Sequence, residues 1–114
     1  MLEAGFASAC ITPPPGCDIP GLFERRLAEG VHDDLYARAV VIADGVRRVA
    51  MVQTDAITVP EPLVREARRR AHAWCGIAPE DCLIAATHTH SGGPVFAGFL
   101  GVPDPDYVSF AAGQ

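Results

Sequence analysis

The pattern of apolar positions divides the first half of the chain into three short extended runs. Residues 6–12 form the first, and Pro13-Pro14-Pro15-Gly16 ends it because proline has no amide hydrogen to donate. Residues 35–43 and 48–54 are two further runs rich in β-branched side chains, separated by Asp44-Gly45, which favours a tight hairpin turn. Their apolar residues occupy nearly every position, so we expect both faces of this sheet to be covered.

A helical period occurs only in the middle of the chain. Apolar residues recur three and four positions apart over about residues 60–75 and predict a helix there. Thr58 and Glu61 have the spacing of a capping box at its start, and Gly76 stands where a left-handed residue ends a helix. The sequence therefore marks both ends of this helix.

The remaining segments predict one more strand, a second helix and two irregular stretches. Residues 82–87 are apolar and predict a strand, which leads into a Gly- and Pro-rich loop. Asp104-Pro105-Asp106 is typical of a helix start and predicts a helix over about residues 104–114. Residues 17–34 show no sustained period and predict an irregular surface segment.

Together these elements predict an α/β fold. The sheet is mixed and mostly apolar, with a hairpin at about residues 35–54, and helices at about residues 60–75 and 104–114 cover it. Because the second helix is not completed before Gln114, we expect the chain to be a truncated part of a larger α/β domain.

Composition narrows the class of protein. Apolar residues make up 49% of the 114 residues and charged residues 20%, which is typical of a globular protein rather than a disordered one. Nine basic and fourteen acidic side chains give a formal net charge of −5, which disfavours binding to nucleic acid or anionic membranes. The sequence has neither a secretory signal nor a transmembrane segment, so a cytoplasmic location is the default expectation and the compartment stays open.

The cysteines could pair in three ways or remain reduced. Without a signal peptide we expect reduced and mostly buried thiols. Their spacing does not match the close cysteine pairs of structural zinc sites. The four residues are Cys10, Cys17, Cys75 and Cys82.

His88 and His90 are the main candidates for chemistry. If the preceding strand stays extended, side chains two positions apart project to the same side, with α-carbons roughly 6.5–7 Å apart. Neutral imidazole is a strong zinc ligand and also a general base near neutral pH. The pair therefore favours metal-dependent hydrolysis, although such pairs also occur at ordinary exposed strand ends.

Small and polar residues around the pair fit the same interpretation. The hydroxyls of Thr87, Thr89 and Ser91 could support metal ligands, and Gly92-Gly93-Pro94 permits a close approach of the backbone. Asp55 ends the neighbouring apolar run, where its carboxylate would either orient a metal-bound imidazole or cap a turn.

Other charged residues have simpler explanations. His32-Asp33-Asp34 fits a solvated turn better than a second contribution to the site. His72, on the predicted helix, has no acidic partner at close spacing and fits a surface histidine. The arginines of that helix alternate with glutamates, which favours a solvated helix face over a phosphate-binding patch. They are Arg65, Arg68, Arg69 and Arg70.

Three segments occur in an order and with a spacing that resemble a known family. They are Ala4-Gly5-Phe6-Ala7 followed by Cys10-Ile11-Thr12-Pro13-Pro14, then Gly30–Ala39, and then Ala85–Gly92. This arrangement resembles the N-terminal region of the neutral/alkaline, non-lysosomal ceramidase family, and the His-x-His-Ser-Gly sequence is its most specific part. The chain departs from the family by reading Ser91-Gly92-Gly93-Pro94 where the family usually reads Ser-Gly-Pro-Gly.

The resemblance implies that residues 1–114 are the N-terminal portion of a ceramidase-like catalytic domain. It implies a zinc-dependent amide hydrolase that cleaves the N-acyl bond of ceramide, or of a related lipid amide, to a fatty acid and an amine. His88 would be a Zn²⁺ ligand, and His90 would lie beside the metal and bind or protonate the reacting groups. The family's remaining ligands, a His, a Glu and a Tyr, are not matched in this chain, so we expect the chain alone to be inactive.

A non-catalytic remnant or partner-binding α/β domain without a complete metal site is the competing interpretation. The apolar loop Val95–Leu100 would then form the binding surface, or would lead to homo-oligomers. Its Phe96, Phe99 and Leu100 could equally be core residues. Tight stoichiometric zinc binding by the 114-residue chain alone would indicate a self-contained site, whereas weak binding indicates that ligands come from elsewhere.

Overall fold

A four-stranded sheet forms the centre of the molecule, in the order β1-β2-β3-β4. The computed structural model describes residues 1–98 and 100–114 of the chain. The first three strands are antiparallel neighbours and β4 is parallel to β3. The strands are β1 (Glu3–Cys10), β2 (Tyr36–Ala43), β3 (Arg48–Thr54) and β4 (Cys82–Ala86).

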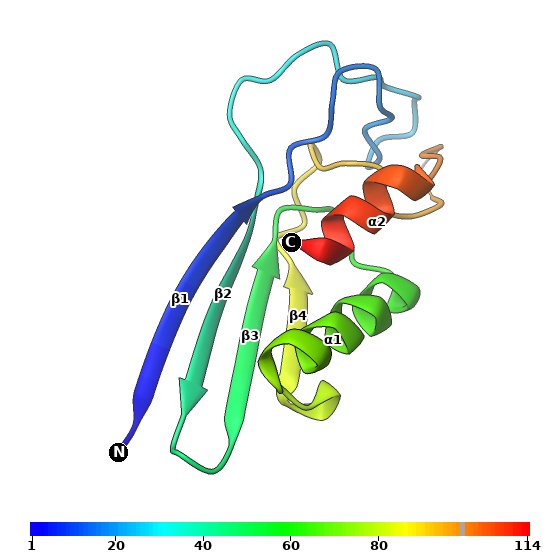
Figure 1. Cartoon of the computed structure of the whole chain (residues 1–114). Coiled ribbons are helices and arrows are strands. Elements are labelled where there is room, and N and C mark those ends of the chain that lie inside the picture. The colour runs from blue at the N-terminus through cyan, green and yellow to red at the C-terminus, as the bar shows by residue number, and fades with distance from the viewer. Residues whose placement is uncertain (99) are drawn as a thin grey trace.

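Two helices lie on one face of this sheet (Figure 1). Helix α1 (Glu61–Cys75), followed by the short 3-10 helix η1 (Pro79–Asp81), connects β3 to β4, and a crossover of this kind is what allows neighbouring strands to run parallel. Helix α2 (Pro105–Gly113) packs beside α1. The predicted α/β class, the hairpin and both helices are confirmed.

The two ends of α1 compare differently with the sequence prediction. Gly76 ends the helix in the left-handed conformation, with φ 67°, as predicted. The predicted capping box is wrong, because Pro60 occupies the N-cap and no side chain of the described residues caps the helix. Glu61 is consequently the first helical residue rather than the third, and its carboxylate pairs with Arg65.

Pairing with β2 determines the bounds of β1. The register joins Glu3 to Ala43 and Cys10 to Tyr36, so β1 lies three residues earlier at its start than the predicted run and ends before Thr12. The turn after β2 lies between the two predicted runs, as expected. It spans residues 44–47, and the Asp44 carboxylate closes it by accepting hydrogen bonds from the amides of Val46 and Arg47 at 2.9 and 2.8 Å.

The core lies between the sheet and the helices. One cluster joins α1, α2 and the loops at the ends of the strands, and the other joins the sheet to the residue after the C-cap of α1. Their buried members are Ala56, Leu63, Val95, Tyr107 and Ala112 in the first cluster, and Ala50, Ile77 and Cys82 in the second.

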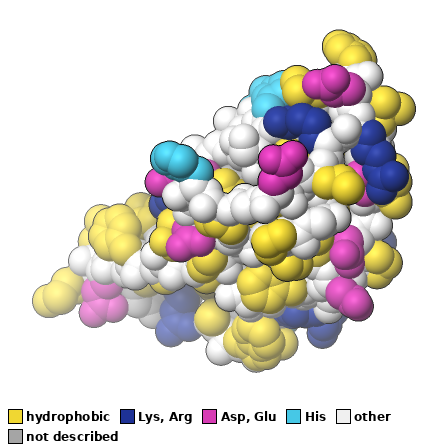
Figure 2. Space-filling model, turned by 90° about the horizontal axis from the view of Figure 1, so that it is seen from above, with side chains coloured by type: hydrophobic (Ala, Val, Ile, Leu, Met, Phe, Trp, Pro, Cys, Tyr) yellow, Lys and Arg dark blue, Asp and Glu magenta, His cyan; other side chains and the backbone are white. Residues whose placement is uncertain are grey.

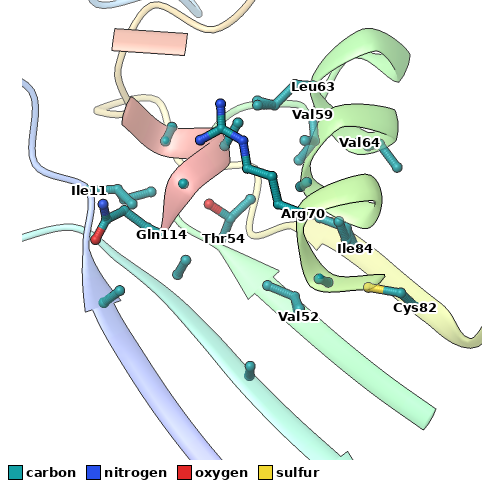
Figure 3. Close-up of a pocket in the computed structure, with 18 of the residues that line it drawn as sticks. Ile11, Val52, Thr54, Val59, Leu63, Val64, Arg70, Cys82, Ile84 and Gln114 are labelled. Carbon is teal, nitrogen blue, oxygen red and sulfur yellow. The ribbon is translucent and has the colours of Figure 1, made fainter. Parts of the chain in front are cut away.

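Side chains do not completely fill the layer between the sheet and the helices. Figure 3 shows Val52 and Thr54 of the sheet and Leu63 and Arg70 of α1 among the residues that line a cavity. The volume of this cavity is about 340 Å³. Alanines of β1 and β2 form part of its floor, and they are too small to reach the helices. These alanines are Ala7, Ala9, Ala37 and Ala39.

The opposite face of the sheet is open, which corrects the expectation that both faces are covered. Phe6, Val40, Met51 and Leu83 are successive cross-strand partners, and we call them the outer apolar row. Phe6 is 82% exposed, Met51 41% and Leu83 58%. Their apolar character therefore reflects a face that the described residues do not cover.

The four cysteines are free thiols, and the expectation that they are mostly buried is wrong. Only Cys82 is buried, because it faces the helices from β4. Cys17 is half-buried, and Cys10 and Cys75 are exposed. Burial raises the pKa of the Cys82 thiol, so this group stays protonated and packs as a small apolar side chain.

Arg65 and Arg69 lie on the solvated helix face that the sequence predicted, whereas Arg68 and Arg70 are half-buried. Arg65 pairs with Glu61, while Arg69 and Arg70 both pair with Glu66. The two hydrogen-bonded guanidinium groups lower the pKa of Glu66 to about 2. Arg68 instead donates to the carbonyl of Cys82 at 2.8 Å, which joins the helix to the start of β4.

In the described part of the chain, neither helix has the length and apolar character that a membrane span requires.

Replacing Asp104 with alanine is expected to lower the free energy of unfolding by about 1 kcal/mol. Its carboxylate caps α2 by accepting hydrogen bonds from the amides of Asp106 and Tyr107 at 2.9 and 3.1 Å, and alanine leaves both donors unsatisfied. Chemical denaturation measures the loss. Asp104→Asn is the matched control, since asparagine caps helices equally well; equal stability of the alanine and asparagine variants would contradict the prediction.

Candidate functional site

The segments that follow β3 and β4 continue side by side beyond the end of the sheet. The amide of Thr87 donates to the carbonyl of Thr54 at 2.9 Å, and the amide of His88 donates to the carbonyl of Ala56 at 3.0 Å. Because parallel neighbouring strands finish at the same edge, residues far apart in the sequence meet here. This arrangement brings His88 next to Ile57.

His88 lies outside the strand and has an unusual backbone conformation. Strand β4 ends at Ala86, and His88 has φ 65°, a value that few residues other than glycine adopt. The expectation of an extended strand through the pair is therefore wrong. The turn directs the imidazole back to the end of β3, where its Nδ1 lies 2.8 Å from the carbonyl oxygen of Ile57.

His90 is held in the same way by a different segment. Its Nδ1 lies 2.8 Å from the carbonyl oxygen of Gly21. A carbonyl oxygen only accepts hydrogen bonds, so Nδ1 carries the proton in both neutral imidazoles. This tautomer leaves the lone pair of Nε2 available on each ring.

The two imidazole rings lie close together despite the break in the strand. Their centroids are 5.1 Å apart and their planes meet at 89°. Both histidines are exposed residues. Figure 2 views the molecule onto this end, where histidine side chains reach the surface among acidic and basic groups. The two rings are therefore neighbours at an accessible end of the molecule.

A short hairpin, residues 16–28, supports His90, and we call it the Gly21 hairpin. Its sides are joined by hydrogen bonds from the amide of Gly16 to the carbonyl of Ala28 at 2.8 Å and from that of Ile19 to the carbonyl of Arg26 at 2.9 Å. An ion pair between Asp18 and Arg25 closes it further. Pro20, Gly21 and Ala28 are buried, so the expectation of a wholly irregular surface segment is wrong.

Gly21 and Arg26 are site residues that the sequence interpretation missed. Gly21 has φ 123°, and a β-carbon there would lie 2.7 Å from Cδ1 of Ile57 and 3.1 Å from Nδ1 of His90. Arg26 is half-buried, and its guanidinium donates to the backbone carbonyl of His90. The Pro20-Gly21 pair is a turn signal, but nothing local indicates that it lies against His90.

The residues predicted to support metal ligands make other contacts. Asp55 accepts hydrogen bonds from the amide of Tyr36 and from Arg38, both at 2.9 Å, so its carboxylate ties the end of β3 to the start of β2. Thr89 accepts a hydrogen bond from the amide of Ser91 within the loop, at 3.3 Å. Thr87 and Ser91 are exposed beside the histidines. The carbonyls of Ile57 and Gly21, rather than Asp55, orient the imidazoles.

The glycines after Ser91 permit the close backbone approach that the sequence predicted. A β-carbon at Gly92 would lie 2.9 Å from Cα of Ala56, and one at Gly93 would lie 2.3 Å from the ring of Tyr107. Burial raises the pKa of Tyr107, and its protonated hydroxyl donates to the carbonyl of Ile11 at 2.6 Å. Tyr107 therefore joins α2, the loop that carries His88 and His90, and the end of β1.

The other candidates lie away from the pair or are partly in the core. His32 is exposed, and its Nδ1 contacts the Asp33 carboxylate at 2.6 Å, as expected for a solvated turn. Val95 of the apolar loop is buried in the first core cluster, whereas Leu100 is exposed. Phe99 lies outside the described residues. The loop is thus partly core and partly surface.

The donor set at the pair fits part of a zinc site. Imidazole Nε2 with a hydrogen-bonded Nδ1 is a common form of histidine in zinc sites, because the second bond fixes the tautomer and the ring orientation. Among residues 1–98 and 100–114, no group of three or more His, Cys, Asp and Glu residues could hold a metal ion. Further ligands would have to come from elsewhere.

Solved ceramidase structures are similar to this chain. The crystal structure of neutral ceramidase from Pseudomonas aeruginosa matches 81% of this chain with 31% identity and a TM-score of 0.67. A ceramidase structure described as complexed with C2 matches with the same three values. The chain spans only 16% and 15% of those two proteins. Searches of protein-family models and of curated protein sequences found no match.

Proposed function

We propose, on the premise that this chain is neutral-ceramidase-like over most of its length, that it supplies a histidine pair to a zinc-dependent amide hydrolase. The substrate would be ceramide or a related lipid amide, cleaved at the N-acyl bond to a fatty acid and an amine. The proximity of the two imidazoles, each with Nδ1 bound to a carbonyl, is the observation that carries this proposal.

Each histidine has a distinct role in the proposed site. His88 would bind Zn²⁺ through Nε2, while the carbonyl of Ile57 fixes its ring. His90 would lie beside the metal, with its Nε2 placed to exchange a proton with the reacting groups. Bound zinc would supply a Lewis acid that polarises the amide carbonyl and activates water.

Residues 1–114 would form the N-terminal portion of the catalytic domain. Catalytic zinc generally has three protein ligands, and the described residues bring together only two imidazoles. The remaining ligands would come from other parts of the complete gene product. We therefore propose that the 114-residue chain by itself binds zinc weakly and is inactive.

Hydrolysis of an N-acyl sphingoid base by the complete gene product is expected to stop when a chelator removes the metal. Activity should return with Zn²⁺ and not with Mg²⁺, because imidazole ligands favour zinc over a cation that prefers oxygen. Release of the fatty acid measures turnover. Chelator-insensitive hydrolysis would contradict the zinc mechanism, whereas hydrolysis of amides without a long acyl chain, but not of lipid amides, would contradict the substrate.

A partner-binding domain is the second candidate, and the exposed outer apolar row favours it. Such a domain needs no complete metal site. Zinc titration separates the two candidates: tight binding by the complete gene product, but not by residues 1–114 alone, supports the hydrolase. Weak binding by both forms supports the partner-binding domain.

A further inference from the structure

The Gly21 hairpin contacts His90 at both its side chain and its backbone. The carbonyl of Gly21 accepts from Nδ1 at 2.8 Å, and Arg26 donates to the carbonyl of the same histidine. These contacts join residues 69 and 64 positions apart in the sequence. One short hairpin thus fixes the ring tautomer and the backbone position of one functional side chain.

The environment of Arg26 supports a role beyond surface charge. The residue is half-buried, and its Nε has no hydrogen-bond partner among the described residues. An unsatisfied buried donor is unfavourable. The hydrogen-bonding of Nε therefore does not explain why the guanidinium of Arg26 occupies this position. The neighbouring Arg25 differs, because it is exposed and forms an ion pair with Asp18.

A second loop also packs against the hairpin. Pro20 is fully buried, and a β-carbon at Gly101 would lie 2.7 Å from its Cβ. Pro20 therefore lies close to the loop that contains Gly101, and the adjacent Gly21 lies close to His90. This packing supports the part of the hairpin whose Gly21 carbonyl accepts the hydrogen bond from His90.

We propose that Gly21 and Arg26 are positioning residues that hold His90 in the Nδ1–H tautomer and aim its Nε2 at the reacting groups. The inference rests on the proposed function for its catalytic consequence, but the tautomer is a property of this chain. An imidazole released from the Gly21 carbonyl would be free to move its proton to Nε2. His90 would then lack the lone pair on the side that faces the site.

The test measures the tautomer directly in the metal-free complete gene product. Side-chain ¹⁵N spectra, recorded where imidazoles are neutral, distinguish Nδ1–H from Nε2–H, and the His90 signals are assigned by their loss in His90→Asn. We expect Nδ1–H for the unmodified protein and a shift toward Nε2–H in Arg26→Ala. Arg26→Lys, which keeps a charged donor, should restore the Nδ1–H tautomer.

Two matched controls separate positioning from general damage. Arg69→Ala removes an exposed arginine of α1 that pairs with Glu66, away from the Gly21 hairpin, and should leave the tautomer unchanged. Gly21→Ala should move the ring, whereas Gly16→Ala should not, because Gly16 also has a positive φ but has nothing within 4 Å of an added β-carbon. An unchanged Nδ1–H signal in folded Arg26→Ala would overturn the role of Arg26.

Turnover provides the second measurement. In Arg26→Ala we expect kcat to fall roughly 10–100-fold, the usual effect of losing a group that orients a catalytic or metal-binding side chain, with a smaller change in KM. If amide hydrolysis is absent in every form but the tautomer shifts as expected, the proposed function fails and the positioning role stands. If turnover is present and the tautomer does not respond, the positioning role fails alone.

Discussion

Replacing His88 with alanine is expected to abolish zinc retention and amide turnover in the complete gene product. The imidazole would be lost, and backbone atoms at this position cannot replace it as a ligand. The fall in kcat/KM should exceed the roughly 10–100-fold that follows loss of an outer partner of a metal ligand. Metal analysis of the purified protein and the rate of fatty acid release measure the two effects.

The backbone of His88 requires a second variant. Alanine is strained at φ 65°, so His88→Ala could also disturb the loop. Asparagine adopts this conformation more readily, which makes His88→Asn the better test of the side chain alone. His72→Ala, on the exposed side of α1, is the matched control and should retain zinc and activity. Full zinc content and turnover in both His88 variants would refute the assignment.

Replacing Gly93 with alanine is expected to lower the free energy of unfolding by about 1–3 kcal/mol or more, the range for overpacking a core. The new β-carbon would lie 2.3 Å from ring carbons of Tyr107, which is 5% exposed and bound through its hydroxyl to Ile11. Moving the ring away from the new β-carbon would disturb the hydrogen bond from its hydroxyl to the carbonyl of Ile11. Chemical denaturation of the two proteins measures the difference.

Gly30→Ala is the control for this prediction. An added β-carbon at Gly30 meets nothing within 4 Å, so this variant should match the unmodified protein or exceed its stability slightly through reduced freedom of the unfolded chain. Equal denaturation midpoints for Gly93→Ala and Gly30→Ala would show that the contact between Gly93 and Tyr107 relaxes without cost.

The elements that the sequence predicted correctly are those with local signals. Helix α1 has a regular apolar period and a glycine at its C-cap, and α2 begins at an aspartate that caps it. The hairpin has two β-branched runs around Asp44-Gly45. Each of these signals lies within a few residues of the structure it determines, so one sequence is enough to read it.

The errors arose where distant residues decide the structure. The bounds of β1 follow from its pairing with β2, and the left-handed turn at His88 follows from the main-chain contacts beyond β3. The proximity of the two histidines was expected from an extended strand, but two separate carbonyls produce it. Gly21 and Arg26 could not be found, because their partner lies in another part of the chain.

The crossover through α1 has a consequence for how this protein can vary. Strands β3 and β4 end at the same edge of the sheet, and His88 makes its hydrogen bonds to Ala56 and Ile57 at that edge. Substitutions on the water-facing side of α1, or changes in chain length before η1, would alter the connection and leave the position of β4 in the sheet unchanged. Divergent versions of the protein can thus exchange the outside of this helix freely while the pair of imidazoles keeps its geometry.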